Sequence, residues 1–371
     1  MRSKRMLIAL ALASAFSLIA SAPVSADGNH HGGRRGAVYT LSNEATGNAV
    51  IEFARERDGE LTQVASYPTG GLGSGSSLGS QGAVVLSNSG RWLLAVDAGS
   101  DEVSVFAVTR RGLRQTDRIG SGGDMPISVT IHRRAVYVLN AGGDGNISGF
   151  RLGRHGNLGP IAGSTRPLST PASAPAQVQF TPDGRQLVVT EKDANAISTY
   201  RVRPSGRAIG PIVNASAGMT PFGFAFDRRG HLIVSEAAGG APGASAVSSY
   251  KVRRDGELRT LSASEGTTQT AACWTVVVGR FAYVTNTGSG TVSSYLIERD
   301  GEISLLDADA GLTGDGSMPI DAAVSDGGRF LYVLGDGTDE VTAFRVGRTG
   351  GLTKIDADGG LPPSSVGLAG S

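Results

Sequence analysis

The chain has 371 residues with a formal net charge of +1, 55 glycines and only 6% aromatic residues. This near-neutral balance excludes the class of proteins that attract nucleic acid or anionic membranes through their overall charge. So many glycines with so few aromatic residues favour short strands joined by tight turns rather than helices.

The N-terminal stretch has the pattern of a targeting segment. Residues 1–26 combine a basic start, an apolar run over 6–20 and small residues at 24–26. This predicts a secretory signal peptide, with a retained N-terminal anchor as the alternative. The apolar run is too short for a permanent span, so we expect a secreted protein, periplasmic or extracellular, with no transmembrane segment once the signal is removed. Residues 27–36 predict a flexible leader, and 37–371 the folded domain.

From residue 37 onward, a unit made of a β-run, a Gly/Asn turn and a second β-run occurs seven times, most clearly at 281–295 (FAYVTNTGSGTVSSY). Aligned on one position of this unit, the copies centre on Tyr39, Leu94, Tyr137, Val188, Ile233, Tyr283 and Tyr332. Their successive spacings are 55, 43, 51, 45, 50 and 49 residues. Spacings of this size are typical of four-stranded propeller blades.

The two ends of the repeat array complement each other. The first repeat begins directly with its second strand at 37–41, whereas the last segment, 362–369, has the pattern of a first strand with nothing after it. Pairing the C-terminal strand into the N-terminal blade closes the ring and leaves no open sheet edge. The sequence therefore predicts an all-β fold, a seven-bladed β-propeller forming one domain, with an open solenoid as the alternative.

Two motifs resemble a known family. The run Tyr283-Val284-Thr285-Asn286 followed by Gly-Ser-Gly, the turn at 181–185 (TPDGR) and the seven-fold count are similar to the bacterial lactonase propellers. That family groups 6-phosphogluconolactonase-like proteins with carboxymuconate cyclases and is similar to the wider YVTN-repeat propellers. The resemblance covers residues 37–369 and implies a propeller that hydrolyses a lactone.

The resemblance also implies where the site residues lie. In such lactonases a His in one first strand, an Arg-His pair in another, and a Glu after an Asn are expected to bind and process the lactone. Here Gly82 occupies the first position, Ala176 and Gln177 the pair, and Glu191 and Lys192 the Asn-Glu positions. A one-residue shift of the alignment returns Glu191 to the Glu position. No histidine remains in these first strands to act as a general base.

Paired carboxylates offer another route to acid–base chemistry. Glu191 and Glu236 occupy the same repeat position in neighbouring blades, so we predict them as the catalytic residues if they converge; isolated surface carboxylates are the alternative. The residues predicted to bind a ligand at the channel mouth are Gln81, Asp97, Asn140, Gln177, Asn286 and Asp321.

Charge is expected to divide between the two rims of the ring. The rim with the second-to-third-strand loops, where the channel mouth lies, carries mostly carboxylates, and the opposite rim carries mostly arginines. An acidic mouth repels phosphorylated or dicarboxylate lactones, which favours a neutral lactone or related ester as substrate. The basic rim is a candidate surface for an anionic envelope polymer, with solvated turn arginines as the alternative.

The same loops bear on the prediction of cofactors and metals. No cofactor and no dedicated metal site is predicted; calcium at 97–101 or 336–339 is the alternative to solvated turn carboxylates. His132 and His231 fall in turns and are expected to be exposed. Cys273, the single cysteine, lies in an apolar run and is expected to be a buried small side chain.

Two functions stay open at this stage. The first is a secreted hydrolase of the lactonase type, acting on a small-molecule lactone or ester with Glu191 and Glu236. The second is a non-catalytic propeller that binds a protein or an envelope polymer through a charged rim. For both we expect a monomer with no nucleic-acid partner.

Overall fold

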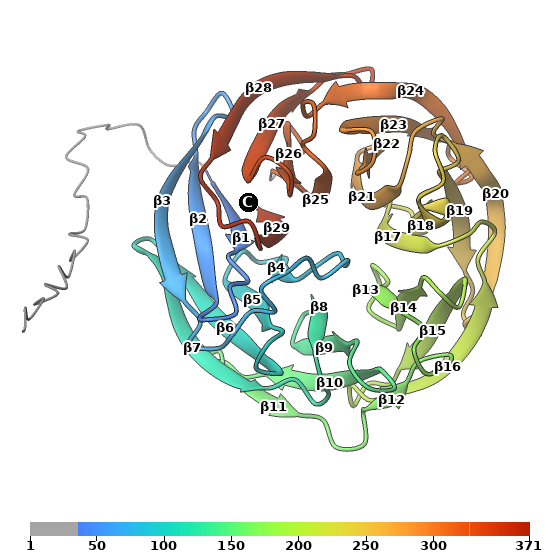
Figure 1. Cartoon of the computed structure of the whole chain (residues 1–371). Helices are drawn as coiled ribbons and strands as arrows, with labels where there is room; N and C mark the ends of the chain where they lie inside the picture. The colour runs from blue at the N-terminus through green and yellow to red at the C-terminus, as the bar shows by residue number, and fades with distance from the viewer. Residues whose placement is uncertain (1–35, 326) are drawn as a thin grey trace, which may run out of the picture. The chain divides into compact units, whose positions relative to one another are not determined.

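The computed structural model describes residues 36–325 and 327–371, and within these ranges seven antiparallel sheets surround a central channel (Figure 1). We number these sheets as blades 1 to 7, with blade 1 formed by β29 and β1–β3, blade 2 by β4–β7, blade 3 by β8–β12, and blades 4 to 7 by successive groups of four strands up to β28. The predicted signal peptide, 1–26, and all but the last residue of the predicted leader lie outside the described residues. Within the described ranges, no helix is both long and apolar enough to cross a membrane.

Four concentric layers of strands make up the ring. The first strands line the channel: β4 (Val84–Leu86), β8 (Pro126–His132), β13 (Pro175–Phe180), β17 (Pro221–Phe226), β21 (Ala272–Val278), β25 (Pro319–Val324) and β29 (Val366–Gly370). The second strands are β1 (Ala37–Leu41), β5 (Trp92–Asp97), β9 (Ala135–Asn140), β14 (Gln186–Glu191), β18 (His231–Glu236), β22 (Phe281–Asn286) and β26 (Phe330–Gly335).

The two remaining layers lie outside these. The third strands are β2 (Ala49–Arg55), β6 (Glu102–Thr109), β10 (Asn146–Leu152), β15 (Ala196–Val202), β19 (Ala246–Val252), β23 (Thr291–Ile297) and β27 (Glu340–Val346). The outer strands are β3 (Leu61–Pro68), β7 (Gly112–Gly120), β11 (Leu158–Pro160) with β12 (Arg166–Pro167), β16 (Ala208–Ala215), β20 (Leu258–Gly266), β24 (Ile303–Leu312) and β28 (Leu352–Gly359). A short 3₁₀ turn, η1, spans Ala238–Gly240.

The predicted seven-fold repeat and its closure are confirmed. Each of the seven aligned residues is the third residue of a second strand and is buried. The C-terminal strand β29 pairs antiparallel with β1, with Tyr39 opposite Ala369 and Leu41 opposite Val366. This strand, which is the first strand of blade 1, begins at Val366 rather than at residue 362, because residues 363–365 still belong to a turn. In Figure 1 the red C-terminal strand accordingly lies beside the blue N-terminal blade.

Burial decreases from the middle of each blade to its edge. The second strands are buried along nearly their whole length, whereas the outer strand β3 alternates between exposed and half-buried residues. Each second strand has a sheet neighbour on both sides and a blade packed on both faces, so apolar residues at every position are favoured there. Tyrosine hydroxyls bridge neighbouring blades: Tyr137 Oη donates to Gly206 O (2.7 Å) and Tyr332 Oη to Gly59 O (3.1 Å). Cys273 is buried, as expected.

Some turns at the basic rim accept only glycine. Gly156, between β10 and β11, has φ +89°, and a Cβ built there would collide with Thr116 Oγ1 and with the Trp92 ring of blade 2. Gly230, between β17 and β18, has φ +85° but faces open space. The two positions share the same backbone strain and differ in packing.

We therefore expect Gly156→Ala to lower the free energy of unfolding more than Gly230→Ala does. The common cost of a left-handed alanine is about 1 kcal/mol, and overpacking adds about 1–3 kcal/mol at Gly156 alone. Urea unfolding followed by circular dichroism measures the difference. Equal losses for the two variants would contradict the blade contact.

Candidate functional site

The channel mouth on the acidic rim is filled by the chain itself. The connection from β3 to β4 lies within the longest spacing between repeats, the 55 residues from Tyr39 to Leu94. Its residues 78–82 reach across the channel. Ser80 Oγ donates to Ile127 O of blade 3 (2.8 Å), and the Gln81 amide donates to Ala176 O of blade 4 (3.0 Å). Lys192 Nζ donates to Gly79 O (2.7 Å). We call residues 78–82 the plug.

Gln81, predicted as a binding residue, anchors the plug to the far side of the ring. Its Nε2 donates to Thr275 O (2.8 Å), while the Thr275 amide donates to its Oε1 (3.1 Å), so that the side chain pairs with β21 as a strand would. Trp274 Nε1 also donates to Ser80 O (2.8 Å). A Cβ at Gly223 would collide with Gln81 Oε1. The predicted first strand of blade 2 is consequently short, because Gln81 belongs to the plug and β4 begins only at Val84.

Gln177 bridges first strands in the same way. Its Nε2 donates to Phe224 O (3.0 Å), and the Phe224 amide donates to its Oε1 (2.6 Å). Lys192, which the alignment places at the Glu position of lactonases, lies 4.7 Å from the centre of the Phe222 ring, and burial lowers its pKa. The positions that the resemblance assigns to substrate binding therefore make contacts within the fold.

The two predicted catalytic residues are completely engaged within their own blades. Ser198 Oγ donates to Glu191 Oε1 (2.5 Å), and the amide and hydroxyl of Ser169 donate to Oε2 (3.0 and 2.6 Å). Glu236 accepts from Gly218 N and Ser248 Oγ at Oε1 and from Ser264 Oγ at Oε2. Glu191 is 0% exposed and Glu236 is 1% exposed. Their catalytic role stays a prediction; the contacts fit a carboxylate that ties the loop entering a blade to that blade.

Three further predicted binding residues occupy the same repeat position. Asp97 accepts from Thr69 Oγ1 (2.5 Å), Ser104 Oγ (2.7 Å) and Asn48 Nδ2 (3.0 Å), and burial raises its pKa. Asn140 Nδ2 donates to Asn146 Oδ1, and Asn286 Nδ2 donates to Thr291 and Ser293. All three are buried at the ends of their second strands.

A sequence signal for this arrangement exists. The third residue of the third strand is a serine in five blades, and in each of these blades it lies close to the terminal residue of the second strand or to its bonding partner. These serines are Ser104, Ser148, Ser198, Ser248 and Ser293. A recurring hydroxyl opposite a carboxylate or amide indicates a repeated structural hydrogen bond rather than a substrate contact.

Asp321 lies on β25 at a cavity of about 400 Å³ inside the channel, which Gln81 and Gln177 also line. Its Oδ1 accepts from the Ala322 amide (2.7 Å), while Oδ2 has no partner within the described chain. Burial raises the pKa of Asp321 well above its usual range. The cause is desolvation, because burial disfavours the charged form of a carboxyl group.

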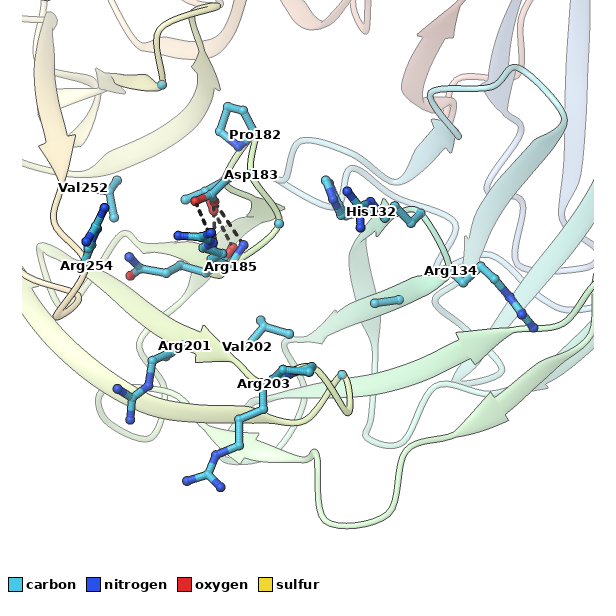
Figure 2. A pocket seen from close by; sticks show the side chains of 18 of the residues that line it. His132, Arg134, Pro182, Asp183, Arg185, Arg201, Val202, Arg203, Val252 and Arg254 are labelled. Atoms are coloured by element: carbon cyan, nitrogen blue, oxygen red, sulfur yellow. Dashed lines mark hydrogen bonds and ion pairs between the residues drawn. The ribbon is translucent and has the colours of Figure 1, made fainter.

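Another cavity lies on the opposite rim. It has a volume of about 970 Å³ and is formed by turns of blades 3, 4 and 5 (Figure 2). We call it the arginine pocket, because its basic lining residues are Arg133, Arg134, Arg151, Arg185, Arg201, Arg203, Arg228, Arg229, Lys251 and Arg254. Among the lining residues of the described chain, Asp183 is the single carboxylate; its Oδ2 lies 3.7 Å from Arg185 Nε.

Local structure explains how these cations converge. The β8–β9, β13–β14 and β17–β18 turns supply arginines from the first-to-second-strand corners. Arg151, Arg201 and Lys251 occupy one register on the third strands, opposite the first residue of each second strand, and they point outward. The sequence predicted the turn arginines on this rim but missed these three. Alternating apolar and polar residues along a third strand equally indicate a face that is simply exposed to solvent.

Two histidines line the arginine pocket. His231 was expected to be exposed, but it is buried, with Nδ1 2.9 Å from Asp227 Oδ2. The same aspartate accepts the His231 and Arg229 amides, so it organises the turn. His132 is half-buried, and burial together with the Arg133 cation lowers its pKa.

No metal cluster supports the calcium alternative: within the described chain, no group of three or more His, Cys, Asp or Glu side chains is arranged to hold an ion. In the loop at 97–101, both carboxylate oxygens of Asp97 already accept hydrogen bonds from side chains of the protein.

We expect Asp321→Asn to stabilise the protein increasingly as pH rises from about 4 to 8. Burial raises the pKa of Asp321 in the folded state above its usual value of 3.8, so the unfolded chain releases this proton at lower pH than the folded state does. The wild type therefore loses stability as pH rises above about 4, by up to about 1.4 kcal/mol per unit. Asparagine removes this linkage. Urea unfolding at pH 4, 6 and 8 measures it, with Asp144→Asn, an exposed carboxylate, as the control. A difference between variant and wild type that does not change with pH would refute the assignment.

Comparisons with known proteins agree with the fold. The family model for the lactonase seven-bladed β-propeller matches residues 34–166, 161–264 and 245–365. The structure is similar to that of a Pseudomonas aeruginosa periplasmic gluconolactonase (18% identity, TM-score 0.67, covering 90% of this chain and 99% of the other). It is also similar to a Lactobacillus plantarum protein (18%, TM-score 0.74, 91% and 99%) and to a Bacteroides fragilis protein with an attributed 6-phosphogluconolactonase activity (19%, TM-score 0.68, 91% and 98%). No curated protein matches the sequence. With the family model covering nearly the whole ring, the chain belongs to the lactonase family of seven-bladed β-propellers.

Proposed function

We propose that this propeller binds an anionic polysaccharide in the arginine pocket. The observation that carries the proposal is a cavity of about 970 Å³ whose lining includes nine arginines, one lysine and a single carboxylate. Guanidinium groups bind carboxylate, sulfate and phosphate oxygens in a bidentate manner and desolvate more readily than ammonium groups. Without a bound anion, this many like charges around one cavity repel each other.

The composition of the pocket favours a polysaccharide over other polyanions. Apart from the imidazoles of His132 and His231, none of its lining residues in the described chain is aromatic, so stacked nucleic-acid bases would have no platform. The strongly exposed apolar residues lie on other loops and outer strands, which leaves this rim without anchors for a membrane. A hollow lined from three blades fits a chain with negative charges at intervals. A secreted protein, as the N-terminal segment predicts, would meet such polymers in the envelope.

Replacing Arg201, Arg228 and Arg254 by glutamine should weaken binding of a uronate oligosaccharide about 10- to 100-fold, since each exposed cation contributes about 0.5–1 kcal/mol. Within the described chain these three side chains make no hydrogen bond or ion pair whose loss would disturb the fold, and they belong to blades 4 and 5. Isothermal titration at 50 and 200 mM salt measures the affinity, which should fall at the higher salt concentration.

The matched control is Arg111→Gln, because Arg111 is an exposed turn arginine outside the pocket. Nucleic acid and anionic vesicles serve as competing ligands. Equal affinity of the triple variant and the wild type, or tighter binding of either competitor, would refute the proposal.

Family membership supports a second candidate, hydrolysis of a neutral lactone or ester on the acidic rim with Glu191 and Glu236 as acid and base. This function requires the plug and the serine contacts of both carboxylates to open, since both side chains are buried. It explains the family match but leaves the arginine pocket without a role.

If this candidate holds, the protein turns over at least one member of a panel of uncharged lactones, and Glu191→Gln lowers kcat at least about 100-fold, the size of a lost acid–base contribution. Asp193→Asn, an exposed neighbour, should leave the rate unchanged. A folded protein that is inactive on the whole panel would eliminate the candidate.

A further inference from the structure

All methionines of the propeller lie on the acidic rim. The sequence contains five methionines, of which Met1 and Met6 fall in the predicted signal peptide. The other three are Met125, Met219 and Met318, in the loops that enter the first strands of blades 3, 5 and 7. Their exposed fractions are 38%, 63% and 46%. Methionine is a residue of cores and of adaptable binding surfaces, and here none of the three is in the core.

At two of the three positions the backbone is held in a conformation that does not favour methionine. Met125 has φ +52° and Met318 has φ +46°, in the left-handed region where glycine or asparagine is the ordinary choice. Asp101 Oδ1 accepts from the Met125 amide (2.6 Å), and Met318 O accepts from the Asp336 amide (3.2 Å). The loop conformation is thus fixed, and the side chain gains no burial from it. Folding alone gives no reason for methionine at these positions.

Other apolar side chains extend the surface. Leu72 enters blade 2 and is 40% exposed, and Leu312 precedes blade 7 and is 61% exposed. We call Leu72, Met125, Met219, Leu312 and Met318 the apolar collar. The plug closes the mouth within this rim, so the collar surrounds a closed face rather than an open channel.

The collar is set among carboxylates. Exposed acidic residues on the same rim are Glu44, Asp101, Asp124, Asp144, Asp193 and Asp315. Three cations on this rim make contacts within the protein. Lys192 donates to the plug, Arg118 Nε lies 3.4 Å from Glu102 Oε1, and Arg166 donates to Thr165 O. The face therefore presents exposed thioether and leucine side chains in a negative field.

We propose that this face docks a cationic amphipathic segment of a partner protein, one in which Lys or Arg alternates with Leu-like side chains. Flexible methionines adapt to the apolar side chains of the segment, and the surrounding carboxylates steer and select its positive charge. The site lies on the rim opposite the arginine pocket, so the inference does not rest on the function proposed above. It makes the propeller a molecule with two independent binding faces.

The test uses the full chain labelled with ¹³C at the methionine methyl groups and a synthetic peptide of leucine and lysine as the probe. The resonances of Met125, Met219 and Met318 should shift on addition of the peptide. The triple substitution to glutamine at these positions should weaken peptide binding at least tenfold. Replacing Met125 and Met318 by glycine should raise the melting temperature while binding weakens, because the backbone strain is relieved.

Matched controls separate the collar from general hydrophobicity and charge. Val64, Val213 and Leu306 are similarly exposed, at 40%, 52% and 44%, but lie within outer strands, whereas the collar residues lie in acidic-rim loops or, for Leu312, at the end of β24. Their triple glutamine variant should bind the peptide as the wild type does. A peptide with glutamine in place of leucine should bind at least tenfold more weakly. Unshifted methionine resonances, equal binding of both peptides, or no effect of the methionine substitutions would overturn the proposal. Affinity for a uronate oligosaccharide should stay unchanged in every collar variant.

Discussion

The side chain of Gln81 joins blade 2 to blade 6 across the centre of the ring. This contact closes the channel at the acidic rim, so it decides which surfaces each rim presents. First strands have one hydrogen-bonding edge that faces the channel, and a buried edge needs partners. Gln81 and Gln177 supply them by pairing with the backbone of Thr275 and Phe224 as a short strand would. With those amides paired and Trp274 Nε1 donating to Ser80 O, the residues at the mouth hold blades on opposite sides of the ring together.

Closing the mouth changes what each rim can do. The acidic rim becomes an outward surface on which exposed methionines and carboxylates are displayed, whereas the opposite rim keeps a hollow lined by arginines. The separation follows from propeller geometry, because all second-to-third-strand loops lie at one end of the blades and all first-to-second-strand turns at the other. A small charge bias in each loop type therefore adds up over seven blades, although the whole chain carries a net charge of only +1.

The predicted site residues at the ends of the second strands share a structural contact. These residues vary from Asp97 and Asn140 to Glu191 and Glu236, and the sequence pattern predicts a ligand site built from different blades. In the structure each makes a hydrogen bond to a serine hydroxyl or an asparagine, in which a carboxylate accepts and an amide donates. The serine pattern of the third strands was present in the sequence, but its meaning depends on which strand it faces.

The sequence by itself determined the ring: the repeat length, the turn glycines, the strand alternation and the complementary ends are local or periodic features, and each second strand formed around its aligned residue. It also placed the turn arginines on one rim. Only the tertiary structure decided that residues 78–82 fill the mouth, that His231 is buried against Asp227, and that cations from blades 3, 4 and 5 share one cavity. These features join residues between 4 and 194 positions apart through side-chain contacts, and no periodicity along the chain records which side chains meet when the ring closes.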